Sequence, residues 1–407
     1  MVEFSFRAPR QTSLLVCSVL VVVAALVAAV PAYRIWAAHS ASHLSTGNPG
    51  PWGRLLHADV PICLPDEFIV LPSENQPPAS WFFKGCTRSQ VLDLLDKAGV
   101  SSREHEEFSR DGQWTGVEGG IRLTPADKTV LGLSPRVRGA IYATLLAVPE
   151  NAEIMDPVWF APETVDRQLA DNGLADKSIA LLKRLLYQNV GSPLLMFADR
   201  DVAMRQLPDD RERRLFIKAV SQKNAVMARL EITRDSPIEA LAAYWGGGGR
   251  GKDLVPLLRS LQKADGQWNA SIAYLLPPFM RSHLNTYPFP SSEAGAVKQD
   301  CFWTAFNALS AEPDNRLNDM QYVRELLDRD YYTIFEPSHL GDIVFIATAD
   351  SQVIHAAVFV ADDLVFTKNG YHYTQPWILM HIRDMVATYT ARYPGSGALK
   401  LLYYRSK

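Results

Sequence analysis

The chain has 407 residues, of which 47% are hydrophobic and 21% are charged, and its formal net charge is −3. This length predicts more than one domain, and the composition is that of an ordinary globular protein. A slightly acidic chain gives no reason to expect a nucleic-acid partner, so we predict no nucleic-acid binding.

An apolar run near the N-terminus predicts a membrane segment. Residues 14–30 carry no charge, and Arg7 and Arg10 precede them. About 20 apolar residues span a bilayer, whereas the apolar core of a signal peptide is shorter. We therefore expect residues 1–38 to be an uncleaved signal anchor, with the N-terminus cytoplasmic and the body outside the cytoplasm in a single-pass arrangement. The alternative is a secreted protein from which this segment is cleaved.

Residues 39–60 are rich in Ser, Gly and Pro, which predicts a linker. A small cap region is expected to follow over residues 61–123. It contains Cys63 and Cys86, and in an oxidising compartment these two cysteines could form a disulfide. The alternative is that both stay reduced, because one sequence does not determine a pairing.

Residues 124–290 predict an irregular α-helical domain. Ser134-Pro135 is typical of a helix start, with a capping residue before a proline in the first turn. The run Gly246–Lys252 matches the beginning of a phosphate-binding loop. However, Asp253 stands where that loop needs Ser or Thr for magnesium, and a helical pattern precedes the run where a strand is required. We therefore predict no nucleotide and no other cofactor.

Residues 291–407 predict a helix followed by an antiparallel sheet, so the fold class is α+β. Asp300 is a good N-cap, and apolar residues recur after it at helical spacing. Further along the chain we expect strands at 343–347, 353–360, 364–367 and 400–404, a turn at Asp362-Asp363, and a helix over 377–389.

Within this region the chemistry-bearing residues are a cysteine and a histidine. Cys301 falls in the first helical turn, where the positive end of the helix dipole favours a thiolate. His355 lies in an apolar strand, and a thiolate with a neighbouring imidazole performs nucleophilic acyl transfer. For the third residue, which holds the far imidazole nitrogen, we favour Asn369, whose amide oxygen accepts without adding charge; the alternative is Thr367.

Structural roles are the alternative for both residues. A buried cysteine commonly acts as a small hydrophobe, and a lone histidine can be a core residue with both nitrogens satisfied. The other histidines of the region, His339, His372 and His381, have no Cys or acidic residue at ligand spacing. The sequence therefore predicts no metal site.

Three motifs together, Asp300-Cys301, Gly341–Phe345 and His355–Val360, resemble those of the NlpC/P60-like superfamily of papain-like cysteine peptidases and amidases. The resemblance is confined to residues 291–407. It implies a papain-like fold there, with Cys301 as nucleophile and His355 as base, and hydrolysis of peptide or amide bonds such as those of bacterial cell walls. The chain departs from the family at Phe302-Trp303, where small residues are usual.

These observations lead to one expected function and two alternatives. We expect a membrane-anchored, exported cysteine hydrolase, held in the membrane by residues 14–30, that acts on a peptide or peptidoglycan-like substrate. Because the bulk of Phe302-Trp303 could block a substrate, one alternative is a catalytically inactive scaffold or binding protein at the membrane. The other alternative is a thiol acyltransferase using the same Cys–His pair.

Overall fold

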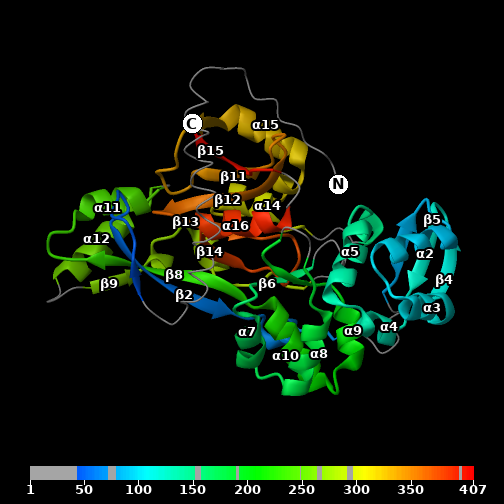
Figure 1. Ribbon diagram of the computed structural model, residues 1–407. Coiled ribbons are helices and arrows are strands. Elements are labelled where there is room, and N and C mark those ends of the chain that lie inside the picture. Colours follow the sequence, from blue (N-terminus) through cyan, green and yellow to red (C-terminus); the bar gives the residue numbers. More distant parts are fainter. Residues whose placement is uncertain are drawn as a thin grey trace. The chain divides into compact units, whose positions relative to one another are not determined.

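The protein is described by a computed structural model that covers residues 44–71, 79–151, 157–188, 192–247, 249–263, 268–290, 297–393 and 397–407 (Figure 1). The chain divides into two compact units. Unit 1 combines the chain up to Cys63 with Lys223–Lys407, and unit 2 is Leu64–Gln222. Unit 2 is therefore an insertion in the chain of unit 1, and the predicted boundary near residue 290 falls inside unit 1.

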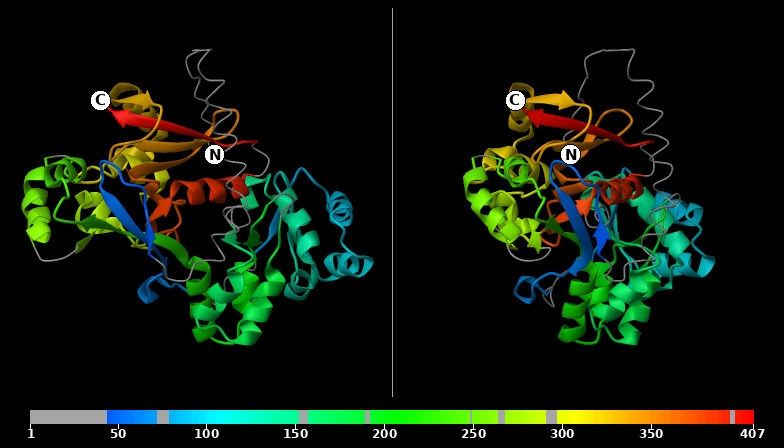
Figure 2. Two further views of the ribbon diagram at one scale, coloured as in Figure 1. Left: turned by 60° about the vertical axis from the view of Figure 1, so that its left-hand side comes forward. Right: turned by 90° about the vertical axis from the view of Figure 1, so that its left-hand side faces the viewer.

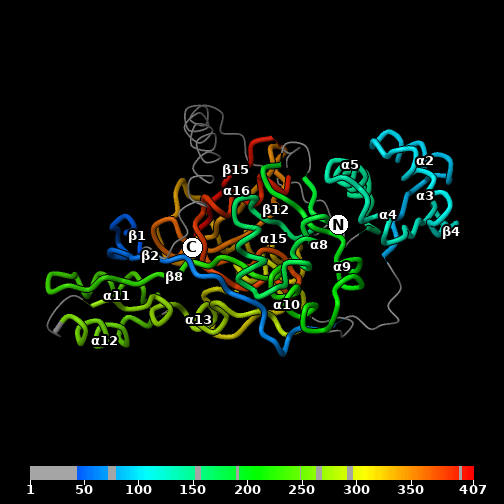
Figure 3. Tube along the Cα trace, turned by 60° about the horizontal axis from the view of Figure 1, so that its bottom comes forward, coloured from blue at the N-terminus to red at the C-terminus, as the bar shows by residue number. Residues whose placement is uncertain are grey.

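A four-stranded antiparallel sheet begins unit 1. Its order is β1-β2-β8-β9, and β2 pairs with β8 from Arg54↔Glu231 to Ile62↔Lys223. The two long strands run side by side in Figure 3. The strands of this sheet are β1 (Ser45–Thr46), β2 (Arg54–Ile62), β8 (Lys223–Ile232) and β9 (Trp268–Ser271).

The prediction of a linker over residues 39–60 was wrong where the structure describes that segment. Gly50 and Gly53 exchange backbone hydrogen bonds of 3.1 and 2.9 Å, and Gly53 has a φ of +89°. These glycines form a tight turn between β1 and β2, because glycine adopts a positive φ without steric cost. The composition that indicated a flexible segment belongs to a hairpin.

Helices next to this sheet share its core. The glycine-rich run near Gly246 joins two helices, as expected from the helical pattern before it, rather than a strand and a helix. The helical segments that follow β8 are α11 (Ile238–Trp245), α12 (Gly251–Lys263), the short 3₁₀ turn η3 (Ile272–Tyr274) and α13 (Pro278–His283).

The C-terminal part of unit 1 contains a six-stranded antiparallel sheet in the order β10-β15-β11-β12-β13-β14. Although β15 is last in the chain, it lies between β10 and β11 (Figure 2). The hairpin predicted across Asp362-Asp363 is confirmed. The strands are β10 (Tyr331–Ile334), β11 (Ile343–Ala347), β12 (Val353–Ala361), β13 (Leu364–Lys368), β14 (Trp377–His381) and β15 (Lys400–Ser406).

The helices of this part are α14 (Cys301–Asn307), α15 (Met320–Asp330) and α16 (Ile382–Arg392), with a 3₁₀ turn, η4, at Asn315–Asn318. Asp300 caps α14 as predicted, because its carboxylate accepts the main-chain N–H of Trp303 at 2.9 Å. The predicted helix over 377–389 was wrong in its first part, since Trp377–His381 is the edge strand β14.

The two faces of the six-stranded sheet are covered by different helices. On one face Ala356, Val358 and Phe366 belong to the same core as α14. On the opposite face Ala357 and Phe359 belong to the core that includes α16. The first core also contains residues of the four-stranded sheet and of α11, among them Leu55, Leu230 and Trp245. This continuous core is why residues 291–407 do not separate from the rest of unit 1.

Unit 2 joins the predicted cap region to most of the predicted helical domain. Trp81 and Phe108 share one core with Tyr142, Tyr187 and Phe216, so residues 61–123 are not a separate cap. Its helices are α2 (Arg88–Lys97), α3 (Ser102–Asp111), α4 (Asp127–Gly132), α5 (Pro135–Leu145), α7 (Val165–Asp171), α8 (Asp176–Leu185), α9 (Arg200–Gln206) and α10 (Asp210–Ser221), with 3₁₀ turns η1 (Asp66–Phe68) and η2 (Pro149–Asn151).

Small sheets complete unit 2, which is therefore mixed rather than purely helical. A three-stranded sheet has the order β3-β5-β4, and β6 pairs with β7. The strands are β3 (Trp81–Lys84), β4 (Gln113–Val117), β5 (Gly120–Thr124), β6 (Val158–Phe160) and β7 (Leu195–Phe197). The chain as described is thus α+β, as the sequence predicts, with helices and antiparallel sheets in both units.

Two further expectations concern the N-terminus and the cysteines. Among the helices that the structure describes, none combines the length and apolar composition that a bilayer crossing requires. The predicted anchor, residues 14–30, lies outside the described residues. The expectation of a single-pass membrane protein is contradicted by the helices that the structure describes. Of the two alternatives for Cys63 and Cys86, the structure shows no disulfide between them.

Candidate metal centre

The thiol of Cys301 is in an environment that opposes its ionisation. The residue lies at the start of α14 and is buried. Burial raises the pKa of the thiol to about 12, and the neighbouring charge of Asp300 adds to this effect. The expected stabilisation of a thiolate by the helix terminus is therefore outweighed by desolvation.

The imidazole of His355 is held on the other face of the sheet. His355 pairs with Ile346 in the register of β12 and β11, and it shares the face of Ala357, which packs toward α16. Its Nε2 lies 2.8 Å from the Thr367 hydroxyl, and its Nδ1 lies 2.8 Å from the Tyr389 hydroxyl. Burial, together with the charge of Arg392, lowers its pKa to about 3. The ring is thus a neutral core group with both nitrogens occupied.

The predicted third residues have different environments. Thr367, the alternative, does contact the imidazole of His355. Asn369 does not hold it, since its side-chain amide is directed to the sulfur of Met380 at 3.4 Å. On the Cys301 face, β13 presents Lys368, whose amine donates to the carbonyls of Gly370 at 2.6 Å and His372 at 3.1 Å. The structure therefore does not bring Cys301, His355 and Asn369 together.

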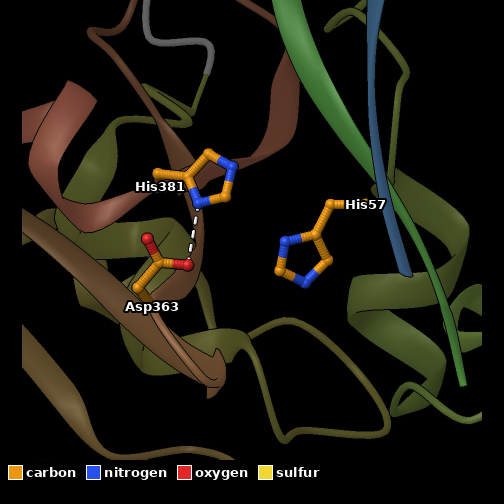
Figure 4. A group of neighbouring side chains, drawn as sticks. All are labelled: His57, Asp363 and His381. Atoms are coloured by element: carbon orange, nitrogen blue, oxygen red, sulfur yellow. Dashed lines mark hydrogen bonds and ion pairs between the residues drawn. The ribbon is translucent and has the colours of Figure 1, made fainter. Parts of the chain in front are cut away.

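A different set of side chains does converge in unit 1. His57 on β2, Asp363 in the β12–β13 turn and His381 at the end of β14 offer ligand atoms that all lie within 4.8 Å of one another. Figure 4 shows the ring of His57 facing the hydrogen-bonded pair of Asp363 and His381. His57 comes from a strand of the four-stranded sheet, whereas His381 and Asp363 come from a strand and a turn of the six-stranded sheet, so the site depends on the packing of one sheet against the other.

Asp363 and His381 form the fixed part of this group. An oxygen of Asp363 lies 2.7 Å from Nδ1 of His381. Pairing across β13 and β14 explains this contact, because Leu364 lies opposite His381. Burial opposes a positive charge on His381, but the hydrogen bond and the charge of Asp363 outweigh burial and raise its pKa.

In His57, one ring nitrogen that could bind a metal ion has no hydrogen-bond partner among the described residues. The residue is only 4% exposed, and its Nε2 has no hydrogen-bond partner among the described residues. Burial lowers its pKa, and the nearby charge of His381 lowers it further. The imidazole is therefore kept in the neutral form that binds metal ions. A buried polar atom without a partner is uncommon, because losing its hydrogen bond to water carries a cost.

The surroundings of the group are acidic. The charges of Asp362, Asp363 and Asp59 each act on His57. Asp384, in the first turn of α16, has its pKa raised to about 6 by burial, with Asp59 and Asp363 contributing. A divalent cation would relieve the repulsion among these carboxylates. The side chain of Asp363 is 38% exposed, so solvent reaches this group.

Two imidazoles and one carboxylate are a ligand set for zinc and related transition metals. Three protein ligands leave a coordination position for water, which distinguishes catalytic zinc sites from closed structural ones. A metal ion bound by Asp363 and His381 together would take the place of the proton that the carboxylate and Nδ1 of His381 share. The group therefore has the composition of a catalytic metal centre, contrary to the expectation of no metal site.

The comparisons with known proteins add no assignment to this geometry. No family model, no curated protein and no solved structure matches the chain. The resemblance to the NlpC/P60-like superfamily therefore rests on the sequence motifs alone.

Sequence reasoning missed all three metal-ligand candidates for identifiable reasons. His57 was placed in a linker, and His381 was expected in a helix. Had residues 377–381 been predicted as a strand, pairing with β13 would have placed His381 beside the turn that carries Asp363. No comparable signal exists for His57, whose approach depends on tertiary packing.

Proposed function

We propose that this protein is a metal-dependent hydrolase whose centre is formed by His57, Asp363 and His381. The convergence of their ligand atoms within 4.8 Å, from three separate segments of unit 1, carries the proposal. His57, His381 and Asp363 would hold the ion through two imidazoles and a carboxylate. A zinc ion bound there would supply a water of lowered pKa as the nucleophile.

The bond class we propose is an amide or peptide bond. The carboxylates of Asp59, Asp362 and Asp384 surround the group and disfavour an anionic substrate such as a phosphate ester. A neutral or cationic substrate does not meet this repulsion. The NlpC/P60-like resemblance of residues 291–407 points to the same bond class, including peptidoglycan-like substrates.

We further propose that residues 291–407 are an NlpC/P60-like, papain-like scaffold without thiol chemistry. The helix with Asp300-Cys301 before an antiparallel sheet supports the scaffold. Cys301 and His355 lie on opposite faces of the sheet, so the imidazole cannot take a proton from the thiol. This argues against both a cysteine hydrolase and a thiol acyltransferase. Either activity would require the His355 side chain to leave its core and cross the sheet.

Metal content is the first test. The full chain is stripped with a chelator, incubated with zinc, desalted and measured by elemental analysis. We expect about one equivalent of zinc for the wild type, and a loss of at least tenfold in affinity for His57→Ala and for His381→Ala. As a matched control, His339→Ala replaces an exposed histidine of the same unit and keeps wild-type binding. Equal zinc binding by all four proteins, or none by the wild type, refutes the metal centre.

Activity is the second test. Zinc-loaded protein is assayed with a neutral N-acetylated aminoacyl anilide and with an aryl phosphate that carries the same ring substituent on its leaving group. We expect hydrolysis of the anilide that disappears with chelation, is restored by zinc and survives Cys301→Ser. Chelator-insensitive hydrolysis that is lost in Cys301→Ser would return the assignment to thiol chemistry.

A further inference from the structure

The turn that carries Asp363 is held by the N-terminal hairpin. Asp362, the preceding residue, accepts the main-chain N–H of Asn48 at 3.0 Å and the side-chain amide of Asn48 at 3.2 Å. These two bonds join positions 314 residues apart. The same hairpin contains β2, so the segment that contributes His57 also holds the turn that contributes Asp363.

Asp362 has a backbone conformation that needs support. Its φ is +56°, in the left-handed region that residues other than glycine seldom adopt. Such a conformation persists where surrounding contacts determine it, and it is often found near functional sites. Here the two hydrogen bonds from Asn48 hold Asp362 in this conformation. The positive φ of Asp362 in turn sets the direction of the backbone at Asp363.

Gly47 allows this close approach. A Cβ at Gly47 would lie 2.4 Å from an oxygen of Asp362 and 2.9 Å from Cε1 of His57. Neither distance is compatible with a real methyl group, so any side chain at this position would displace the carboxylate and the imidazole together. The hairpin, the turn and the metal-ligand candidates are therefore one packed arrangement.

We propose that Asp362 is a positioning residue of the metal centre and that the Asn48–Asp362 contact couples the N-terminal hairpin to it. This inference rests on the proposed metal-dependent function. In this role Asp362 binds no metal itself; it fixes the turn so that Asp363 meets His381 and His57. Docking of the hairpin then delivers one ligand directly and orders a second.

The test measures zinc affinity by competition with a chromogenic zinc chelator, together with the unfolding temperature of metal-free protein. Asp362→Gly keeps the left-handed turn accessible but removes the contact with Asn48. We expect it to lower zinc affinity by about 10- to 100-fold, the range typical of residues that orient metal ligands. Asp362→Asn should retain affinity within about threefold, because its amide oxygen still accepts one of the two hydrogen bonds from Asn48 and asparagine tolerates a positive φ.

Ser351→Gly is the matched control. Ser351 has a φ of +70° in the turn before β12. This variant therefore also replaces a left-handed residue of the same sheet by glycine, but at a position away from the metal group. We expect wild-type zinc affinity for it. A merely structural role for Asp362 predicts that Asp362→Gly and Ser351→Gly change the metal-free unfolding temperature without a selective loss of zinc binding.

The outcomes separate this inference from the function on which it rests. If the wild type binds zinc and Asp362→Gly binds equally tightly, the positioning role is refuted while the metal centre stands. If the wild type binds no zinc, both are refuted. Should Asp362→Gly fail to fold, Asn48→Ala replaces it: a loss of zinc affinity supports the coupling, and unchanged affinity refutes it.

Discussion

Cys301 and His355 lie on opposite faces of the six-stranded sheet: Cys301 begins α14 on one face, and His355 packs against Tyr389 of α16 on the other. Cys301 therefore has no imidazole beside it to accept its proton. Burial raises the pKa of its thiol to about 12, so the thiol stays protonated at neutral pH. We expect iodoacetamide to alkylate the exposed Cys63 well before Cys301 in the native protein, as followed by peptide mass spectrometry.

Denatured protein, in which both cysteines should react alike, is the control for this experiment. His355→Asn should leave the rate at Cys301 unchanged, since the imidazole does not contact the thiol. Rapid alkylation of Cys301 at pH 6 that slows in His355→Asn would contradict the arrangement described here.

Zinc should stabilise the folded protein in a manner that depends on pH. An ion at a hundredfold excess over its dissociation constant contributes about 2.7 kcal/mol. Because the hydrogen bond with Asp363 raises the pKa of His381, protons compete with zinc as the pH falls through that pKa. We expect the zinc-induced rise in unfolding temperature to be large at pH 8, to shrink below neutrality and to be absent in His381→Ala. A rise that is independent of pH would argue for binding elsewhere.

His355 should make the protein less stable in mild acid. Burial lowers its pKa to about 3 in the folded state, whereas an exposed imidazole titrates near 6.5. Between these values the unfolded chain binds more protons, so the free energy of unfolding falls as the pH falls below 6.5. From pH 6.5 to 4.5 this loss is on the order of 2–3 kcal/mol.

Urea titrations of wild type and His355→Gln at several pH values test this expectation. The variant should be less stable at pH 7 but should lose less stability between pH 6.5 and 4.5. His339→Gln, which replaces an exposed histidine, should follow the wild-type curve. Parallel curves for wild type and His355→Gln would show that the buried imidazole does not set the dependence on pH.

Unit 2 contains a buried ion pair that should be costly to break. Arg138 is fully buried, its Nε lies 3.2 Å from an oxygen of Asp199, and the Tyr142 hydroxyl donates to the same carboxylate. Removing one member leaves the other charge buried, which typically costs about 3–5 kcal/mol. We expect Arg138→Met to lose this much in the free energy of unfolding, measured by chemical denaturation.

The double variant Arg138→Met with Asp199→Leu should recover part of that loss, because neither charge then remains unpaired. Asp166→Asn is the control, since it breaks an exposed pair with Lys183 and should cost at most about 1 kcal/mol. A loss for Arg138→Met no greater than that for Asp166→Asn would mean that the buried pair contributes little.

Local patterns predicted the elements around residue 300 well. The Asp300 cap, the buried face of α14, the β12–β13 hairpin and the closing strand are all present, because capping and alternation act over a few residues. The same patterns failed at 377–381, where an apolar run was assigned to a helix although it pairs with β13. Short apolar runs satisfy either periodicity, and tertiary packing decides between them.

The face occupied by His355 could in principle be inferred from sequence, whereas the metal group could not. His355, Ala357 and Phe359 share the parity of a strand, so the imidazole lies on the side of whichever helix covers that face. The helix that covers this face is determined by the topology of the fold, and short sequence motifs do not specify the topology. His57 and His381 are brought together only by the packing of two sheets, and no spacing along the chain encodes that contact.

The insertion point of unit 2 has a consequence for modularity. Unit 2 leaves and re-enters unit 1 next to Ile62 and Lys223, which are paired neighbours on β2 and β8. Antiparallel neighbours can be joined by a two-residue turn, so the gap left by excising Leu64–Gln222 is no wider than an ordinary hairpin. Unit 2 is thus inserted at one end of a strand pair of unit 1. A domain at this position can be exchanged or deleted without changing the order of the strands in unit 1.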